Sequence, residues 1–181
     1  MSPPATRACR TPPVVKPSGQ VRGFSAGFSI IEIMVAMTIG SVVIAVSIPI
    51  VKRADTASKA AVVANDLKTF AGAFGAYANE KGGWPAETAA GVMPPEMVDR
   101  LRSTSWLRAS PMGGQYNWEF NQMHGGVRYK AAVSISETAT VPLLVNADLL
   151  LAIDKVIDDG NLNTGNFITG VNNDPLYIIE K

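Results

Sequence analysis

The hydrophobic pattern divides the first 81 residues into three stretches. Residues 1–27 are polar and proline-rich, residues 28–51 are apolar with Glu32 as their only charge, and residues 52–81 are mixed. A helix over residues 28–51 would be about 36 Å long, enough to cross a hydrocarbon layer about 30 Å thick. The apolar run therefore predicts a membrane-spanning helix, which Pro49 near its far end is expected to bend.

The helix is expected to continue beyond the apolar run. Residues 52–81 contain no proline, and their apolar residues recur at spacings of four and three, which places them on one helical face. The members of this face are Val63, Leu67, Phe70, Phe74 and Tyr77. Gly82-Gly83, with Pro85 just beyond, ends the pattern. The prediction is one helix over residues 28–81 with a transmembrane half and an amphipathic half.

Residues 82–181 predict a small α+β head. A short helix begins at Pro95, and a second is capped by Asn146 and ended by Gly160. The segments "QYNWEF" and "GVRYKAAVSIS" alternate apolar and polar residues around a Gly-Gly turn and predict an antiparallel hairpin, and "GNFIT" and "PLYIIE" predict two more strands. In the second hairpin strand one face is expected to carry Val127, Tyr129, Ala131, Val133 and Ile135. The fold class is α+β, with the long helix packed on a small antiparallel sheet.

Charge is distributed as in a membrane-targeted protein. Residues 1–27 hold four Lys/Arg and no acid, whereas the other residues hold 12 Lys/Arg and 15 Asp/Glu. A nucleic-acid-binding protein would instead concentrate its basic residues on the folded part. Cys9 is the only cysteine, which excludes an intrachain disulfide and a cysteine-based zinc cluster. Because no apolar run precedes Cys9, lipidation there is disfavoured.

Residues 27–32, "GFSIIE", resemble the cleavage and methylation site of type IV prepilins and type II secretion pseudopilins. In that family a dedicated peptidase cuts after the glycine and N-methylates the next residue, which implies cleavage after Gly27 and methylation of Phe28. The family carries an acid at the fifth processed residue and often a bending proline at the twenty-second. Glu32 and Pro49 stand at those places, and the resemblance extends to about residue 85.

The resemblance implies a pilin-like fold. It also implies that the chain is a structural filament subunit and not an enzyme. It implies a basic leader that is removed (1–27), a transmembrane and filament-core helix (28–51), its amphipathic continuation (52–81) and a globular head (82–181). Implied partners are identical and related pilin-like subunits, a prepilin peptidase, an assembly ATPase, an inner-membrane platform protein and the membrane. No nucleic acid is expected. The implied location is the inner membrane, single-pass, with the leader cytoplasmic and the head periplasmic, and then a periplasmic or surface filament.

Within the family, three features favour a type II secretion pseudopilin. They are the modest head, the lack of a cysteine pair and the "YANEKGGWP" end of the helix. The alternative is a type IV pilus subunit for adhesion, motility or DNA uptake. An alternative of another class is a single-span, membrane-anchored binding protein. A secretory signal peptide cut after "AVS" (45–47) fits less well, because the run is long and holds an acid.

The acid in the apolar run has a physical explanation that is independent of the resemblance. An acid at the middle of a membrane helix costs about 2.5–3.5 kcal/mol, and less near the helix end, but a buried acid still needs a partner. Cleavage after Gly27 would create an amine at Phe28, about one helical turn from Glu32. Such a pair within or between subunits sets the register of assembly more than it adds stability.

Two candidate sites lie in the head. Asp158, Asp159, Asn161 and Asn163 suggest calcium, which the major pseudopilins bind near their C-terminus, although the spacing does not match the common calcium loop. The alternative is a helix end with local Asp and Asn hydrogen bonds. Apart from calcium, no cofactor is expected. His124, the only histidine, has no second histidine or cysteine nearby to complete a metal site, and the three tryptophans are expected in the core or at its rim.

Overall fold

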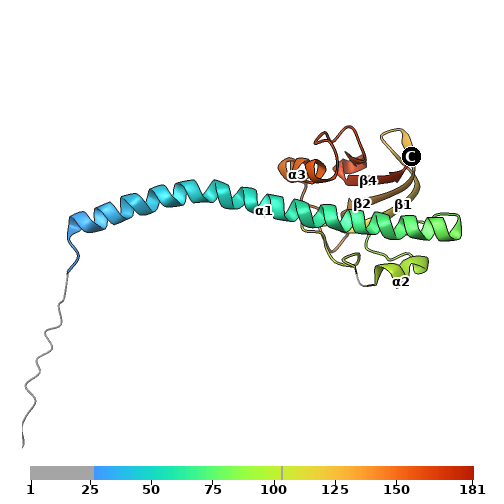
Figure 1. Ribbon diagram of the computed structural model, residues 1–181, viewed down its shortest axis with the longest axis horizontal. Coiled ribbons are helices and arrows are strands. Elements are labelled where there is room, and N and C mark those ends of the chain that lie inside the picture. Colours follow the sequence, from blue (N-terminus) through green and yellow to red (C-terminus); the bar gives the residue numbers. More distant parts are fainter. Residues whose placement is uncertain (1–26, 103) are drawn as a thin grey trace, which may run out of the picture. The chain divides into compact units, whose positions relative to one another are not determined.

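The computed structural model describes residues 27–102 and 104–181 (Figure 1). Contacts divide the chain into two units, residues 1–42 and 43–181, and each is described by itself. Helix α1 (Ile30–Lys81) runs through the end of the first unit and the beginning of the second, with Pro49 inside it. Gly82, at φ 71°, ends α1 in the left-handed conformation that glycine adopts most readily. The single long helix is confirmed.

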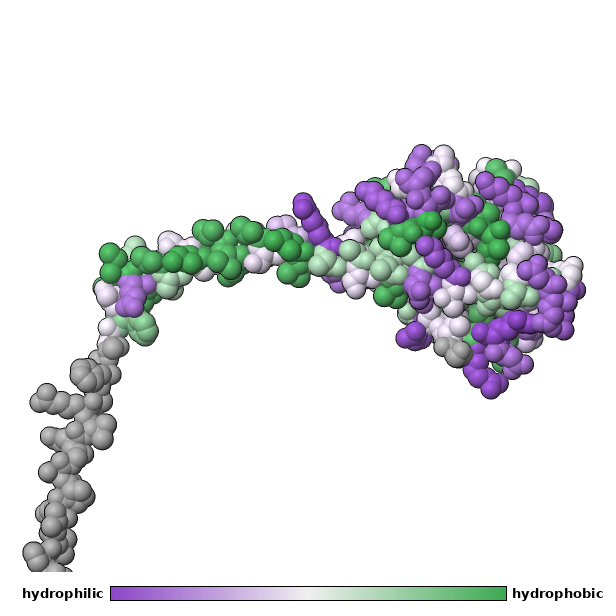
Figure 2. All heavy atoms as spheres, viewed as in Figure 1, coloured by the Kyte–Doolittle hydropathy of each residue, from purple (hydrophilic) through white to green (hydrophobic). Residues whose placement is uncertain are grey.

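The apolar part of α1 is long and hydrophobic enough to cross a membrane, and none of that stretch is buried inside the protein. Its side chains form the hydrophobic surface along α1 in Figure 2. Exposed fractions of large apolar side chains there range from 46% at Ile33 to 80% at Ile30. A soluble protein would bury such a surface, so this part of α1 needs lipid or protein around it.

The amphipathic half of α1 buries the face that the sequence predicts. Val63, Leu67, Phe70 and Phe74 are 0–1% exposed, and Tyr77 packs against the same cluster at its rim. The spacing of four and three brings these side chains onto one side of the helix, where they face the head. The predicted amphipathic continuation is therefore confirmed.

The described residues of the head form four short helical segments and a four-stranded sheet. The helical segments before and after the hairpin are η1 (Pro95–Met97), α2 (Val98–Leu101) and α3 (Ala147–Ile157), and η2 (Val171–Asn173) lies between the last strands. The strands are β1 (Gln115–His124), β2 (Val127–Ser136), β3 (Phe167–Thr169) and β4 (Pro175–Glu180). All pairs are antiparallel, in the order β1-β2-β4-β3. The predicted hairpin, both helices and both later strands are confirmed.

An aromatic cluster joins α1 to the sheet. The ring of Phe74 stacks on Trp118 of β1, with centroids 3.9 Å apart and planes at 5°, and it also contacts Trp106 at 5.4 Å. Phe70 meets Trp106 and Tyr116 edge to face at 5.0 and 4.7 Å. Aromatic pairs in these arrangements contribute about 0.5–1.5 kcal/mol beyond the area that they bury. The head and the second half of α1 thus share one core.

One expectation for β2 is wrong. Ala131, Val133 and Ile135 join the core beneath α1, but Tyr129 packs with Ala132, Leu176 and Ile178 in a second cluster, and Val127 is 51% exposed. The β2–β4 register shifts between Ala131 and Ala132. The extra residue at this shift, Ile179, lies on β4, and the alternation of the β2 sequence does not reveal the irregularity.

A buried hydrogen bond also ties α1 to β1. The Tyr116 hydroxyl donates to Asp66 Oδ2 at 2.9 Å. Burial raises the pKa of Tyr116, and the negative charge of Asp66 raises it further. The phenol therefore stays protonated and keeps donating across the physiological pH range.

Replacing Tyr116 with phenylalanine is expected to destabilise the head by about 1–2 kcal/mol, because Asp66 loses a hydrogen-bond donor. The loss is limited to this range because Asp66 is half-buried and water can replace part of the lost bond. Chemical denaturation with tryptophan fluorescence measures the change. The matched control is Tyr129→Phe, since the Tyr129 hydroxyl makes no hydrogen bond within residues 27–102 and 104–181. Equal losses in the two variants would contradict a specific role for the Tyr116–Asp66 bond.

Candidate functional site

The start of α1 brings together the residues that the sequence singles out. The Ser29 carbonyl accepts hydrogen bonds from the Glu32 and Ile33 amides at 3.0 and 3.2 Å, which begins the helix. Phe28 is 76% exposed, and its side chain lines a shallow hollow together with Glu32 and Met37. Gly27 lies just before the helix, and a side chain there would meet nothing within 4 Å. Among residues 27–102 and 104–181, no side chain or backbone group packs against Gly27.

This geometry suits a carboxylate whose partner is made by cleavage. Glu32 is exposed, and no side-chain hydrogen bond or ion pair engages it among the described residues. The Phe28 nitrogen lies before the first turn of α1, about one turn from Glu32. A new amine at Phe28 would carry a positive charge within reach of this acid or of the acid of a neighbouring subunit.

A family model for the prokaryotic N-terminal methylation motif matches residues 22–48. The chain carries the type IV prepilin signal motif. The match covers the glycine, the phenylalanine and the acid, and it ends one residue before Pro49. The motif is shared by prepilins and pseudopilins and identifies this chain as pilin-like. Comparisons with curated proteins and with solved structures found no match.

The motif and the fold agree in this pilin-like chain. The motif begins at residue 22 and covers most of the apolar run, and α1 continues from it into an α+β head. The roles of Gly27, Phe28 and Glu32, and the bend at Pro49, stay predictions.

The four candidate calcium ligands lie in the loop after α3, where they hydrogen-bond to the loop itself. Asp158 accepts from the Asn166 amide, and Asp159 accepts from the Asn161 amide at 2.8 Å and the Thr164 hydroxyl at 2.7 Å. Asn161 Oδ1 accepts from the Asn163 amide at 3.2 Å. These contacts explain two adjacent acids at a helix end, because each one closes part of the loop.

Asp154, on α3, stands in the same stretch of acids, and the sequence analysis did not predict that it is buried. It is 0% exposed, and neither carboxylate oxygen has a hydrogen-bond partner within the described ranges. Burial raises its pKa, as do the charges of Asp159 and Asp158, whereas the Asn161 and Gly160 amides act in the opposite direction. The sequence contains a sign of this burial, since Asp154 falls four residues after Leu150, on the apolar face of α3.

Replacing Asp154 with asparagine is expected to stabilise the protein by about 1 kcal/mol at pH 7, because a buried charge is costly. The folded pKa lies above the usual 3.8, so the native state binds the proton more tightly than the unfolded state. The contribution of Asp154 to wild-type stability is therefore most favourable below pH 3.8 and is lost as pH rises through the folded pKa. The gain in Asp154→Asn should shrink towards pH 4.

Thermal unfolding between pH 4 and pH 8 measures this difference. The matched control is Asp148→Asn, which removes an exposed acid from the same helix and is expected to change stability by no more than about 0.5 kcal/mol. A loss of stability in Asp154→Asn that does not vary with pH would contradict the prediction.

The hydrogen bonds within this loop favour the alternative of a helix end with local Asp and Asn hydrogen bonds over calcium binding. No three Asp, Glu, His or Cys side chains are grouped so that they could hold a metal ion in residues 27–102 and 104–181. We therefore expect about 1 mM calcium, a level that weak extracellular sites require, to leave the melting temperature of EDTA-treated protein unchanged. A rise of several degrees that Asp159→Asn abolishes would instead establish calcium binding by this loop.

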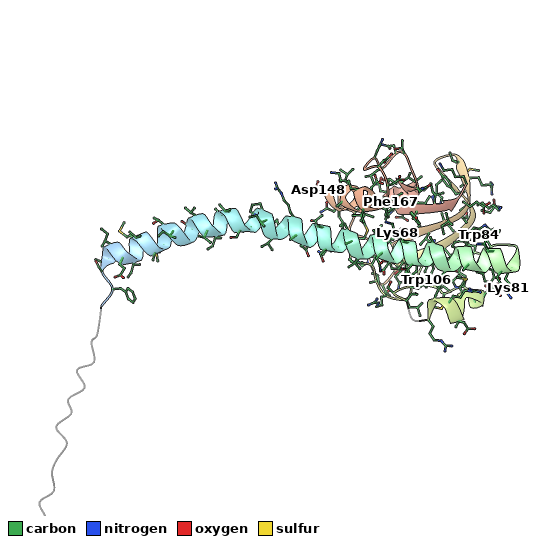
Figure 3. All side chains as sticks on the ribbon, viewed as in Figure 1. Lys68, Lys81, Trp84, Trp106, Asp148 and Phe167 are labelled. Atoms are coloured by element: carbon green, nitrogen blue, oxygen red, sulfur yellow. The ribbon has the colours of Figure 1, made fainter. Side chains whose placement is uncertain are left out.

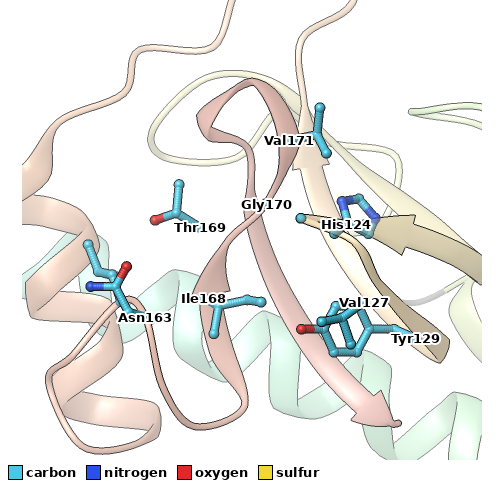
Figure 4. A pocket seen from close by; sticks show the side chains of 10 residues that line it. His124, Val127, Tyr129, Asn163, Ile168, Thr169, Gly170 and Val171 are labelled. Atoms are coloured by element: carbon cyan, nitrogen blue, oxygen red, sulfur yellow. The ribbon is translucent and has the colours of Figure 1, made fainter.

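His124 is the last residue of β1, just before the Gly-Gly turn, and lies beside a pocket of about 270 Å³ (Figure 4). Its Nε2 atom is 3.8 Å from Glu119 Oε2, and neither ring nitrogen makes a hydrogen bond in the described part of the chain. Tyr129 and Ile168 line the same pocket. Besides His124 itself, Asn163 is the one candidate site residue that lines the pocket, so the pocket is separate from the signal motif.

Proposed function

We propose that this pilin-like chain is a subunit of a type IV filament and, more narrowly, a type II secretion pseudopilin. The observation that carries the proposal is the exposed Glu32 at the start of an exposed apolar helix, next to a bond whose cleavage would supply its positive partner. In this proposal residues 1–27 are removed, residues 28–51 form the fibre core, residues 52–81 continue that helix and residues 82–181 form the head.

In the proposed mechanism, the precursor waits in the inner membrane with its leader in the cytoplasm and its head in the periplasm. Four positive charges precede the apolar run, against Lys52 and Arg53 directly after it, which supports that orientation. After cleavage, the apolar helices of neighbouring subunits pack against one another, so that each helix exchanges contacts with lipid for contacts with protein. An assembly ATPase and a platform protein supply the energy of extraction, and the resulting periplasmic fibre drives protein export.

N-terminal sequencing and intact mass of the protein from cells that contain a prepilin peptidase test the processing step. We expect a mature chain that begins with N-methyl-Phe28. The matched control is Gly27→Leu, which fills the open space before the scissile bond and should remain full length. A mature wild-type protein that begins at Met1 or at Ile48 would contradict the filament proposal and favour a membrane-anchored binding protein or a signal peptide.

Secretion and pilus function are separated by deleting the gene. Loss of exported proteins with normal surface motility supports a secretion pseudopilin. Loss of motility, adhesion or DNA uptake with normal export supports a pilus subunit instead.

A further inference from the structure

Helix α3 points its N-terminal end towards the apolar part of α1. Asp148 and Ala152, near the start of α3, line one groove with Lys52, Arg53 and Thr56 of α1. Farther along both helices, Lys68 Nζ donates to the Val156 carbonyl at 3.1 Å. Figure 3 labels Asp148 and Lys68 at these two levels. The helices therefore run in the same direction, and all these residues belong to the second unit.

The end of the apolar run fixes where the membrane surface must lie while the chain is anchored. Val51 is the last residue of the run, and Lys52 follows it. Thr56 lies about 6 Å farther along the helix, one turn on. The polar layer on each side of the hydrocarbon core is about 5–8 Å thick. The groove between α1 and the start of α3 thus lies at the depth of the lipid head groups.

The charges and apolar groups at this end of the head suit a lipid surface. Lys52 and Arg53 are exposed and form no ion pair within residues 27–102 and 104–181, whereas Lys59 pairs with Asp55 at 2.8 Å. Just before the cap of α3, Leu144 is 69% exposed and Val145 is 47% exposed. Leu144 and Val145 stand outside the groove that Lys52 and Arg53 line, and Val145 lines another hollow with Glu137 and Asp174. Unpaired cations at the end of an apolar run, with exposed apolar side chains elsewhere on the same end of the head, are typical of surfaces that contact anionic lipids.

We propose that this surface, which we name the α3 corner, binds anionic phospholipid head groups. It consists of Lys52, Arg53, Thr56, Leu144, Val145, Asp148 and Ala152. Lys52 and Arg53 bind lipid phosphates, and Leu144 enters the polar layer. Asp148 opposes the anion and limits the affinity. The contact holds the head against the membrane before assembly and must break when a subunit leaves the bilayer. The proposal rests on the membrane-anchored state, not on the choice between secretion and pilus function.

A spin label at residue 144 tests the α3 corner in the full-length chain. Cys9→Ser removes the only cysteine, and Leu144→Cys then gives one labelling site. The protein is reconstituted into nanodiscs of phosphatidylcholine alone or mixed with phosphatidylglycerol. We expect the label to be shielded from a water-soluble nickel reagent in the mixed discs only, and about 0.5 M salt to weaken that shielding. A label at Val127, about 30 Å away across the hairpin, is the control and should stay accessible.

Charge variants give the expected magnitude. Each cation near an anionic leaflet contributes about a fivefold factor, so Lys52→Gln with Arg53→Gln should lower the ratio of docked to free heads about 25-fold. Asp148→Asn should raise that ratio. Lys59→Gln is the matched control, because Lys59 already has a partner, and unchanged melting temperatures verify folding.

Each other outcome overturns the proposal. Accessibility at residue 144 equal to that at residue 127 in the mixed discs would show that the α3 corner stays in water. If shielding of the label is the same in both kinds of disc and increases with the number of protein molecules per disc, the α3 corner contacts a second copy of the chain and not lipid. If alkaline carbonate extracts the protein from natural membranes, the membrane-anchored state itself is refuted. This outcome is distinct from a failure of the α3 corner to bind lipid in a protein that stays anchored.

Discussion

Replacement of Glu32 by leucine is expected to leave the protein in the membrane and to abolish fibre assembly. The rest of the apolar run carries no charge, so the variant inserts at least as readily as the wild type. Assembly should fail because the amine at Phe28 loses its acid. Removing one member of a buried pair costs about 3–5 kcal/mol, a factor of about 10²–10⁴ in association. The register between subunits is lost with it.

Membrane fractionation and electron microscopy of sheared fibres measure the two effects separately. Thr38→Leu is the matched control, because it removes a polar group from the same helix without removing a charge. The Thr38 hydroxyl donates only to the Val35 carbonyl within its own helix. Normal fibres from Glu32→Leu would refute the register argument, and loss of fibres from both variants would point to general damage to the apolar helix.

Replacement of Phe74 by alanine is expected to cost about 3–5 kcal/mol, a large share of the 5–15 kcal/mol that typically stabilises a domain. Phe74 is fully buried between Trp118 and Trp106, so its removal leaves a cavity where α1 meets β1. For a domain of this size the melting temperature should fall by about 10–20 °C. The stacked tryptophan should also lose its near-ultraviolet circular dichroism signal.

The matched control for Phe74 is Val62→Ala on the same helix. Val62 is 47% exposed, and its truncation should change stability by no more than about 0.5 kcal/mol. Comparable losses in the two variants would show that the amphipathic half of α1 is not held by its aromatic face. Insertion into the membrane should be normal in both variants, since the apolar run is unchanged.

Local signals were sufficient where one stretch of chain decides the structure by itself. The signal motif, the length of the apolar run and the amphipathic face each lie within one continuous stretch of chain, so periodicity and composition reveal them. The Asn146 cap was predicted for the same reason, since its side chain accepts from the Asp148 and Leu149 amides only two and three residues away. The hairpin follows from alternation around a glycine pair.

Only the tertiary structure decided features that depend on distant residues. Tyr129 packs in a second cluster with Leu176 and Ile178 of β4, which lie more than 40 residues away along the chain. The burial of Asp154 depends on the loop that folds back over α3. The direction of α3 along α1, and hence the α3 corner, depends on contacts such as that of Lys68 with Val156. Sequence by itself therefore determined the pilin-like layout and the prepilin signal motif, because these are local. Tertiary packing determined which polar groups are buried or exposed, because burial is a property of what surrounds a residue.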